Sequence, residues 1–254
     1  YKGQFLSSDD QKRSAYAAYN KNHFIFKDVS YRGVVNLPNG KTANLFGMNR
    51  QRIANDFVLY NEYFAPSTKT NPWGIEVKGK NNKVVAVSNK GNMKIEPGTY
   101  VLSAHGNAKP YLAGIKPGDK ITISESLSNN NADKMETVIS GGPLLLEKGV
   151  LNVRIEEEKI ASDIAKGRAP RTALGLKKDG TILLLVVDGR SKASAGLTLY
   201  ELAQYLKKLG AYDALNFDGG GSSEMVIKGK VMNNPSDGHE RAVSMGLGLL
   251  KVER

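Results

Sequence analysis

Cysteine is absent from the 254 residues of the chain. Its absence excludes disulfide bonds, thiolate metal ligands and cysteine nucleophiles. Histidine occurs only three times, so a zinc site built from the usual histidine and cysteine ligands is not expected. No apolar run approaches the roughly eighteen residues that a membrane-spanning helix needs. The length and an ordinary hydrophobic content instead predict a globular chain with a sizeable core.

Acidic residues are in the minority, since 25 Asp and Glu stand against 36 Lys and Arg, which gives a formal net charge of +11. Such an excess steers polyanions towards the protein surface. The basic residues are scattered along the chain and form no cluster of the kind that nucleic-acid-binding proteins show. We therefore expect no specific nucleic-acid partner, while anionic glycopolymers and phosphate-bearing substrates remain candidates.

The pattern of short strands and turns predicts an α+β fold, with β-rich mixed sheets, a few helices and a site in loops at strand ends. Residues 1–24 are expected to form an N-terminal helical extension, because Ser8-Asp9-Asp10 could cap an amphipathic helix that ends near Asn20. Residues 25–254 then form the main domain. No internal repeat is visible.

Several elements carry strong local signals. Thr198 and Glu201 have capping-box spacing, which predicts that a helix begins at Thr198. Gly210 is expected to end this helix. Asp179-Gly180 suits a tight hairpin turn. The other expected elements are hairpins over 77–87, 172–187 and 225–232, a strand over 214–217 and a final strand over 243–252.

The most informative stretch is Phe217-Asp218-Gly219-Gly220-Gly221-Ser222-Ser223. Consecutive glycines allow successive N–H groups to point into one concavity and bind an anion, and the two serines add hydroxyl donors. An ordinary tight turn capped by Asp218 is the alternative. The stretch lacks the lysine of a phosphate-loop NTPase. We expect Gly219, Gly220, Gly221, Ser222 and Ser223 to bind an anion.

Three aspartates lie where catalytic carboxylates are often found. Asp188 follows the apolar run Ile182–Val187, Asp218 follows the strand expected over 214–217, and Asp237 lies in a Pro-Ser-Asp-Gly turn. Each could instead cap a turn ahead of its glycine. Asp188 and Asp218 could also hold a hard divalent cation such as Ca²⁺ or Mg²⁺.

The ordered motifs resemble one known family. DGGGSSEMV, NNPSDGHER, SGGPLLLEKG and PRTALGLKKDGTILLLVVDGR are similar, in order and spacing, to the phosphodiester glycosidase family, and FGMNRQR, LYNEYFAPSTKTNPWGIEV and TYVLSAHG resemble its N-terminal half. The resemblance covers roughly residues 45 to 250. The chain departs from the family pattern at Glu224, Ala242 and Met245, which leaves the identity of the substrate open.

The resemblance implies hydrolysis of a sugar-1-phosphodiester, in which the sugar is an N-acetylhexosamine or a hexose of a cell-wall or capsule polymer. Because the departing phosphate monoester has a second pKa of about 6, it needs bound cations more than it needs a proton. Arg171 and Arg241, which lie inside family-like motifs, are expected to bind that phosphate.

The family-like motifs hold the remaining candidates. Asp188, Asp218 and Asp237 are expected to supply catalysis. Arg50 in FGMNR is a third candidate for binding the phosphate, and His105 in SAHG is expected to line the substrate site. The chain begins at Tyr1 and not at Met, which fits removal of a leader, and we expect a secreted or cell-surface protein. Two alternatives remain open: a non-catalytic binder of anionic glycopolymers, and a phosphodiesterase that breaks the P–O bond. The sequence does not indicate the oligomeric state.

Overall fold

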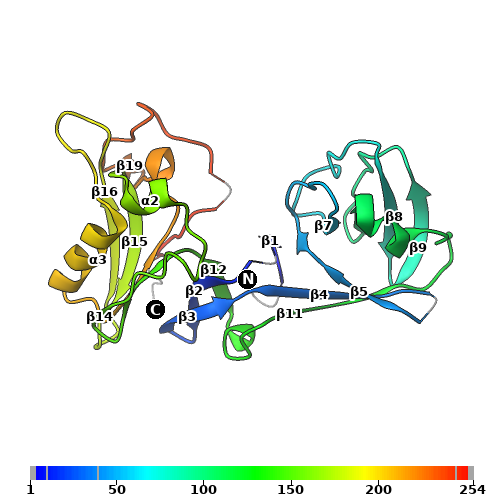
Figure 1. The fold of residues 1–254 in the computed structure, drawn as a ribbon, viewed down its shortest axis with the longest axis horizontal. Helices are drawn as coiled ribbons and strands as arrows, with labels where there is room; N and C mark the ends of the chain where they lie inside the picture. Colours follow the sequence, from blue (N-terminus) through cyan, green and yellow to red (C-terminus); the bar gives the residue numbers. More distant parts are fainter. Residues whose placement is uncertain (1–3, 10, 39, 244, 251–254) are drawn as a thin grey trace. The chain divides into compact units, whose positions relative to one another are not determined.

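The chain forms two compact units. The computed structural model describes residues 4–9, 11–38, 40–243 and 245–250. Unit 1 draws on residues 1–12 and 28–138, and unit 2 draws on residues 13–27 and 139–254. Both units are rich in strands, with only a few short helices (Figure 1). The α+β fold class predicted from the sequence is therefore confirmed.

Unit 1 contains a six-stranded sheet in the order β1-β6-β7-β10-β8-β9 and a three-stranded sheet in the order β11-β4-β5. Its pairs are antiparallel except for β6 and β7, which run parallel. The elements are β1 (Ser8–Asp9), β4 (Tyr31–Asn36), β5 (Thr42–Leu45), β6 (Gly47–Met48), β7 (Phe57–Asn61), β8 (Gly74–Lys80), β9 (Lys83–Ser88), β10 (Tyr100–His105), η1 (Gly106–Ala108), α1 (Lys109–Leu112), β11 (Thr122–Leu127) and η2 (Ala132–Lys134).

Strand β7 explains how unit 1 is packed. Side chains alternate between the two faces of a strand, and in β7 both faces are buried. Phe57 and Leu59 join the larger core, which also receives residues from β4 and β5. Val58 and Tyr60 join a smaller core on the opposite face. The large sheet is therefore covered on both sides along its central strands.

Unit 2 contains a five-stranded sheet in the order β14-β13-β17-β15-β16, a three-stranded sheet in the order β12-β2-β3, and the hairpin β18-β19. The elements are β2 (Arg13–Tyr19), β3 (Asn22–Val29), β12 (Thr137–Ser140), β13 (Leu144–Glu147), β14 (Val150–Leu151), α2 (Ser162–Lys166), β15 (Arg171–Leu176), β16 (Ile182–Val187), α3 (Leu199–Lys208), β17 (Asp213–Asn216), η3 (Gly220–Ser222), β18 (Val226–Ile227) and β19 (Lys230–Val231).

The five-stranded sheet of unit 2 lies between two layers. Helix α3 packs on one face, where Leu199, Leu202 and Leu206 join residues of β13, β15 and β17 in one buried cluster. On the opposite face, Leu174 and Leu215 pack with Tyr16 of β2 and with residues of β3 and β12. This three-layer core fixes the ends of the central strands, where the candidate site lies.

Most of the strong local signals are confirmed. The hairpins β8-β9, β15-β16 and β18-β19 and the strand β17 occupy the expected segments. Helix α3 begins with a complete capping box, in which the Thr198 side chain accepts from the Glu201 N–H and Glu201 accepts from the Thr198 N–H.

The predicted N-terminal helix is wrong. Ser8 and Asp9 form the short strand β1, and residues 13–19 form strand β2. Ser14 to Ala17 are all buried, which suits a strand covered on both faces and not a one-sided surface helix. Pairing with β12 and β3 overrides the local capping signal. The proposed division at residue 24 is not tested by this result, although the two compact units divide the chain differently.

The final strand predicted over 243–252 is not formed within the described part of that segment, residues 243 and 245–250. Gly246 and Gly248 interrupt it, and glycine weakens a strand interior. Leu249 and Leu250 remain exposed, the second at 91%. The rest of the predicted strand lies outside the described residues.

Candidate active site

The topology of unit 2 brings two predicted carboxylates to one sheet edge. Strands β16 and β17 both run antiparallel to β15, so they end where β15 begins. Asp188 follows β16 and Asp218 follows β17. A Cβ atom at Gly189 would lie 2.6 Å from the Pro170 nitrogen, and one at Gly219 would lie 2.8 Å from the Pro170 oxygen. The turns that carry the two carboxylates therefore both contact the segment entering β15.

The glycine loop that follows Asp218 does not form the expected open anion nest. The Gly219 N–H donates to the carboxylate of the preceding aspartate at 2.9 Å, and the Gly220 N–H donates to the Pro170 carbonyl at 2.9 Å. The N–H groups of Ser222 and Ser223 bond back to the carbonyls of Gly219 and Gly220, both at 3.2 Å. Four N–H donors are therefore already engaged, and the prediction of an open nest is wrong.

Charged side chains lie against the loop instead. A Cβ atom at Gly220 would lie 3.2 Å from both terminal nitrogens of Arg190. At Gly221 it would overlap the guanidinium of Arg241 and the carboxylate of Asp237. These last two are joined by a hydrogen bond of 2.8 Å from Nε and by an ion pair of 2.5 Å. The glycines thus admit two guanidinium groups close to the backbone, where side chains would exclude them.

Asp188 ties a second segment to the loop. Its Oδ1 accepts from the Asn233 side chain at 3.1 Å and from the Asn234 main-chain N–H at 3.0 Å. Its Oδ2 accepts from the Asn234 side chain at 3.2 Å. The Asn233 amide also donates to the Ser223 carbonyl at 3.1 Å. These contacts give Asp188 a positioning function, whereas its predicted catalytic function remains a prediction.

Asp218 has a more open setting. Asp218 is exposed, and its Oδ1 accepts a hydrogen bond from the Gly219 N–H. Within the described part of the chain, Oδ2 has no recorded hydrogen bond. A carboxylate that is oriented through one oxygen and accessible through the other can approach a substrate, so Asp218 is the best placed of the three aspartates for chemistry.

Arg171 serves the fold at this sheet edge. The side chain is buried, and its Nε donates to the Leu197 carbonyl at 2.8 Å. Its Nη2 donates to the carbonyls of Ile164 and Gly167, both at 2.7 Å. Burial, followed by the nearby charge of Arg190, lowers the pKa of Arg171. These bonds give no support to the predicted contact with phosphate.

Arg190 is the residue that the sequence reasoning missed. It is exposed, has a positive φ of 56°, and forms no ion pair with any described residue. Positive φ is uncommon outside glycine. The sequence could have pointed to Arg190, because it directly follows Asp188-Gly189 in the turn after an apolar strand. Arg190 and Arg241 now form the candidate pair of phosphate-binding arginines.

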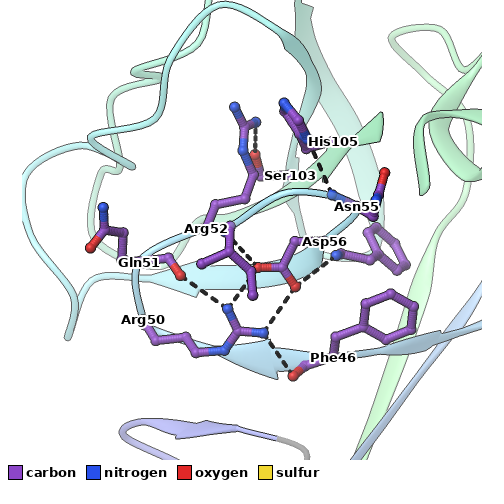
Figure 2. Close-up of polar contacts among 10 residues, drawn as sticks. Phe46, Arg50, Gln51, Arg52, Asn55, Asp56, Ser103 and His105 are labelled. Atoms are coloured by element: carbon purple, nitrogen blue, oxygen red, sulfur yellow. Dashed lines mark hydrogen bonds and ion pairs between the residues drawn. The ribbon is translucent and has the colours of Figure 1, made fainter. Parts of the chain in front are cut away.

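Arg50 and His105 belong to unit 1, whereas the residues described above belong to unit 2. Arg50 forms a bidentate pair with the buried Asp56, at 2.6 and 2.9 Å, and also donates to the Phe46 carbonyl (Figure 2). His105 Nδ1 accepts from the Asn55 N–H at 3.2 Å. Arg50 therefore braces a loop of unit 1, and the structure gives its predicted contact with phosphate no support.

Two further carboxyl groups, those of Glu224 and Glu240, interact with each other although they are distant in sequence. Glu224 follows the glycine loop and Glu240 precedes Arg241. Loss of solvent raises the pKa of Glu224, and the charge of Glu240 and a hydrogen bond with it raise that pKa further. Glu224 was noted in the sequence as a departure from the family pattern, and its neighbour gives that departure a physical consequence.

The predicted divalent cation finds no ready ligand set. Among the described residues, no group of three or more His, Asp or Glu side chains could hold a metal ion. Asp188 already accepts from the two asparagines, which leaves its oxygens poorly available. The charged groups at this edge are instead two arginines beside the glycine loop and an exposed carboxylate at the adjoining strand end.

Comparison with known proteins decides the family. The phosphodiester glycosidase family model matches residues 61–250. The chain belongs to this family. A hydrolase of the glycosidase type is thus supported for the family, and the motifs around Asp188, Asp218 and Asp237 all fall within the match.

Individual relatives match parts of this family member. The SPbeta prophage-derived protein YomE of Bacillus subtilis is 47% identical over 74 residues, which are 29% of this chain and 12% of YomE. The N-acetylglucosamine-1-phosphodiester alpha-N-acetylglucosaminidase of Bos taurus is 42% identical over 67 residues, which are 26% of this chain and 12% of the bovine protein. The chain thus spans only a small part of these relatives.

A solved structure supports the fold. The crystal structure of a hypothetical protein from Synechocystis has a TM-score of 0.79 and 22% identity, and the match covers 91% of this chain and 45% of that protein.

In the described parts of the chain, no helix has the length and apolar character needed to cross a bilayer.

Proposed function

We propose that the protein hydrolyses a sugar-1-phosphodiester by breaking the bond between the anomeric carbon and the phosphate oxygen. The observation that carries the proposal is the pair of guanidinium groups of Arg190 and Arg241, which lie against Gly220 and Gly221 beside the open carboxylate of Asp218. The substrate sugar is an N-acetylhexosamine or a hexose. The name of the bovine relative, which specifies N-acetylglucosamine, favours the former.

Phosphate binding is the first task of this site. Guanidinium groups match phosphate oxygens in a bidentate manner, and Arg190 has no carboxylate partner among the described residues. Asp237 holds the Arg241 guanidinium by its Nε edge and Nη2. Because a phosphate monoester is a weakly basic leaving group, stabilising its charge supplies most of the help that it needs.

The anomeric carbon requires a carboxylate. Glycosidases use one carboxylate to attack that carbon or to activate water, and Asp218 is the accessible candidate. Asp188 positions the Asn233–Asn234 segment against the loop. The serine hydroxyls and glycines of residues 219–223 would line the phosphate side of the pocket, without acting as an open nest.

Two alternatives use the same surface. A non-catalytic binder of anionic glycopolymers would keep the arginines but show no turnover, and a phosphodiesterase would break the P–O bond. The accessible Asp218 favours an enzyme over a binder. Action on a wall or capsule polymer would require location outside the cytoplasm, and we propose a secreted or cell-surface protein on that ground.

Phosphorus NMR tests this proposal. The purified protein is incubated with N-acetylglucosamine 1-(methyl phosphate) and with the corresponding glucose diester. We expect the diester signal to be replaced by that of methyl phosphate, and Asp218→Asn to abolish the conversion while the protein stays folded. If the wild type converts neither diester, or if Asp218→Asn is as fast as the wild type, the proposed function is wrong.

A further inference from the structure

A second polar cluster lies in unit 1, in the loop between β6 and β7. The carboxylate of Asp56 is buried and accepts two hydrogen bonds from Arg50. It also accepts from the main-chain N–H groups of Ile53 and Phe57, at 2.9 and 3.1 Å. The buried carboxylate of Asp56 thus fixes the backbone of this loop, from which the neighbouring side chains extend (Figure 2).

Arg52 is held in place by partners outside the loop. Its Nη1 donates to the Ser103 hydroxyl at 2.8 Å, and its Nη2 donates to the carbonyl and to the side-chain oxygen of Asn71, at 2.9 and 2.6 Å. Ser103 in turn donates to Glu76 at 3.0 Å, and Glu76 is fully buried. The guanidinium is therefore rigid, and its charge is balanced by Glu76 through one hydroxyl group.

Trp73 lies in the turn that leads into β8, and His105 ends the neighbouring strand β10. Gly74, which follows Trp73, pairs with His105 in the register of β8 and β10. The Asn71 side-chain oxygen that accepts from Arg52 also accepts from the Trp73 N–H at 3.3 Å. Trp73 is 70% exposed although tryptophan is usually well buried. It is the only tryptophan of the chain.

His105 can offer a donor to solvent. Because its Nδ1 accepts from the Asn55 N–H, the neutral ring carries its proton on Nε2. Figure 2 shows this ring, which comes from the end of β10, on the same side of the loop as the Arg52 guanidinium. Donors from a histidine and an arginine thus lie near the turn that carries an exposed indole.

The charge balance indicates the class of ligand. The terminal nitrogens of Arg50 donate to Asp56 and to two carbonyls, and those of Arg52 donate to Ser103 and Asn71. Neither guanidinium is therefore open to a phosphate group in the way that Arg190 is. A pyranose ring instead offers a face of C–H groups for the indole and hydroxyl groups for planar donors and acceptors. We propose that Trp73, Arg52, His105 and Asn71 form a saccharide-binding surface for an uncharged pyranose ring of a glycan.

This Trp73 surface belongs to unit 1, whereas the candidate active site belongs to unit 2, and the two differ in chemistry. The active site presents arginines to a charged phosphate, while the Trp73 surface presents an aromatic ring and hydrogen bonds to a neutral sugar. Its task would be to bind a neutral sugar. The binding claim itself does not require that the protein be a hydrolase.

Tryptophan fluorescence tests the proposal directly, because Trp73 is the only source of the signal. The probe is the trisaccharide of N-acetylglucosamine, and inorganic phosphate is the comparison. We expect a saturable shift with a Kd of about 1 mM for the trisaccharide and no saturable shift with phosphate. His105→Ala should weaken trisaccharide binding by about tenfold, as loss of one good hydrogen bond would.

Trp73→Ala needs a second method, such as ligand-observed NMR, and it should lose trisaccharide binding. Tyr200→Ala is the matched control, since it removes a half-exposed aromatic from α3 in unit 2. Both variants should melt like the wild type and hydrolyse the small methyl phosphodiester at unchanged rates. No saturable shift, a saturable response to phosphate, or retained binding in Trp73→Ala would overturn the proposal. Absence of hydrolysis would overturn the proposed function and leave this binding result interpretable.

Discussion

Arg241 donates from Nε to the Asp237 carboxylate at 2.8 Å. Both groups lie so close to Gly221 that a side chain at that position would collide with them. The carboxylate fixes the plane of the guanidinium, and the glycine allows it to approach the loop backbone. This relationship between Asp237 and Arg241 places a rigid cation beside the loop that follows Asp218.

Removal of Arg190 or Arg241, the two arginines that lie against the glycine loop, should impair hydrolysis of the natural substrate. For Arg190→Ala and Arg241→Ala we expect kcat/KM to fall by about 10²–10³, which corresponds to about 3–4 kcal/mol of lost transition-state stabilisation. Steady-state kinetics on the methyl phosphodiester provide the measurement. A 4-nitrophenyl glycoside, whose leaving group needs no phosphate site, should show a much smaller loss. Equal losses on the two substrates would mean that the arginines hold the sugar or the fold.

Gly221→Ala should separate activity from stability. The added methyl group meets the ends of the Asp237 and Arg241 side chains, which can move aside without disturbing the core. We expect a small change in Tm but a loss of at least about tenfold in kcat/KM, because the guanidinium is displaced. Gly246→Ala is the control, since a methyl group there meets open space. Full activity in Gly221→Ala would show that the position of Arg241 is unimportant.

Arg171→Met should affect stability more than Arg241→Met does. The buried Arg171 satisfies the carbonyls of Leu197, Ile164 and Gly167, and methionine would leave them without that donor. We expect the free energy of unfolding to fall by about 2–4 kcal/mol for Arg171→Met and to change little for the exposed Arg241. Urea denaturation of both variants decides this. Similar stabilities would restore Arg171 as a candidate ligand for phosphate.

Glu224 gives a prediction for pH. Loss of solvent and the neighbouring Glu240 raise its pKa in the folded protein. A carboxyl group whose pKa is raised by folding favours the folded state at low pH, and that contribution is lost as pH rises through the folded pKa. Glu240→Gln should therefore move the NMR-detected titration of Glu224 to lower pH. It should also reduce the loss of stability across that range. An unmoved titration would show that Glu240 does not influence Glu224.

The sequence predicted those elements whose signals are local. The capping box of Thr198 and Glu201 specified the start of α3, and Asp179-Gly180 specified the turn between β15 and β16. The same kind of evidence failed at residues 8–20. There, β2 pairs with the neighbouring strand β3 and with β12, which lies far away in sequence, and the local capping pattern does not report that long-range pairing.

The candidate site was predicted in part. The sequence pointed to Asp188 and Asp218 because each follows a strand, and to Asp237 and Arg241 because both lie in a family-like motif. It could not show that Arg171 faces inward to three carbonyls, or that Arg190 takes a positive φ and lies against Gly220. The direction of a side chain at a sheet edge depends on the segments that pack there, and the sequence does not display them.

The bond that breaks is the central claim, and water labelled with heavy oxygen tests it most directly. The methyl phosphodiester is hydrolysed in labelled water, and the methyl phosphate produced is examined by phosphorus NMR and mass spectrometry. Attack at the anomeric carbon predicts methyl phosphate without heavy oxygen and a sugar that carries it. Heavy oxygen in the methyl phosphate would mean that the P–O bond breaks, and it would contradict the assignment of Asp218 and the two arginines to a glycosidase.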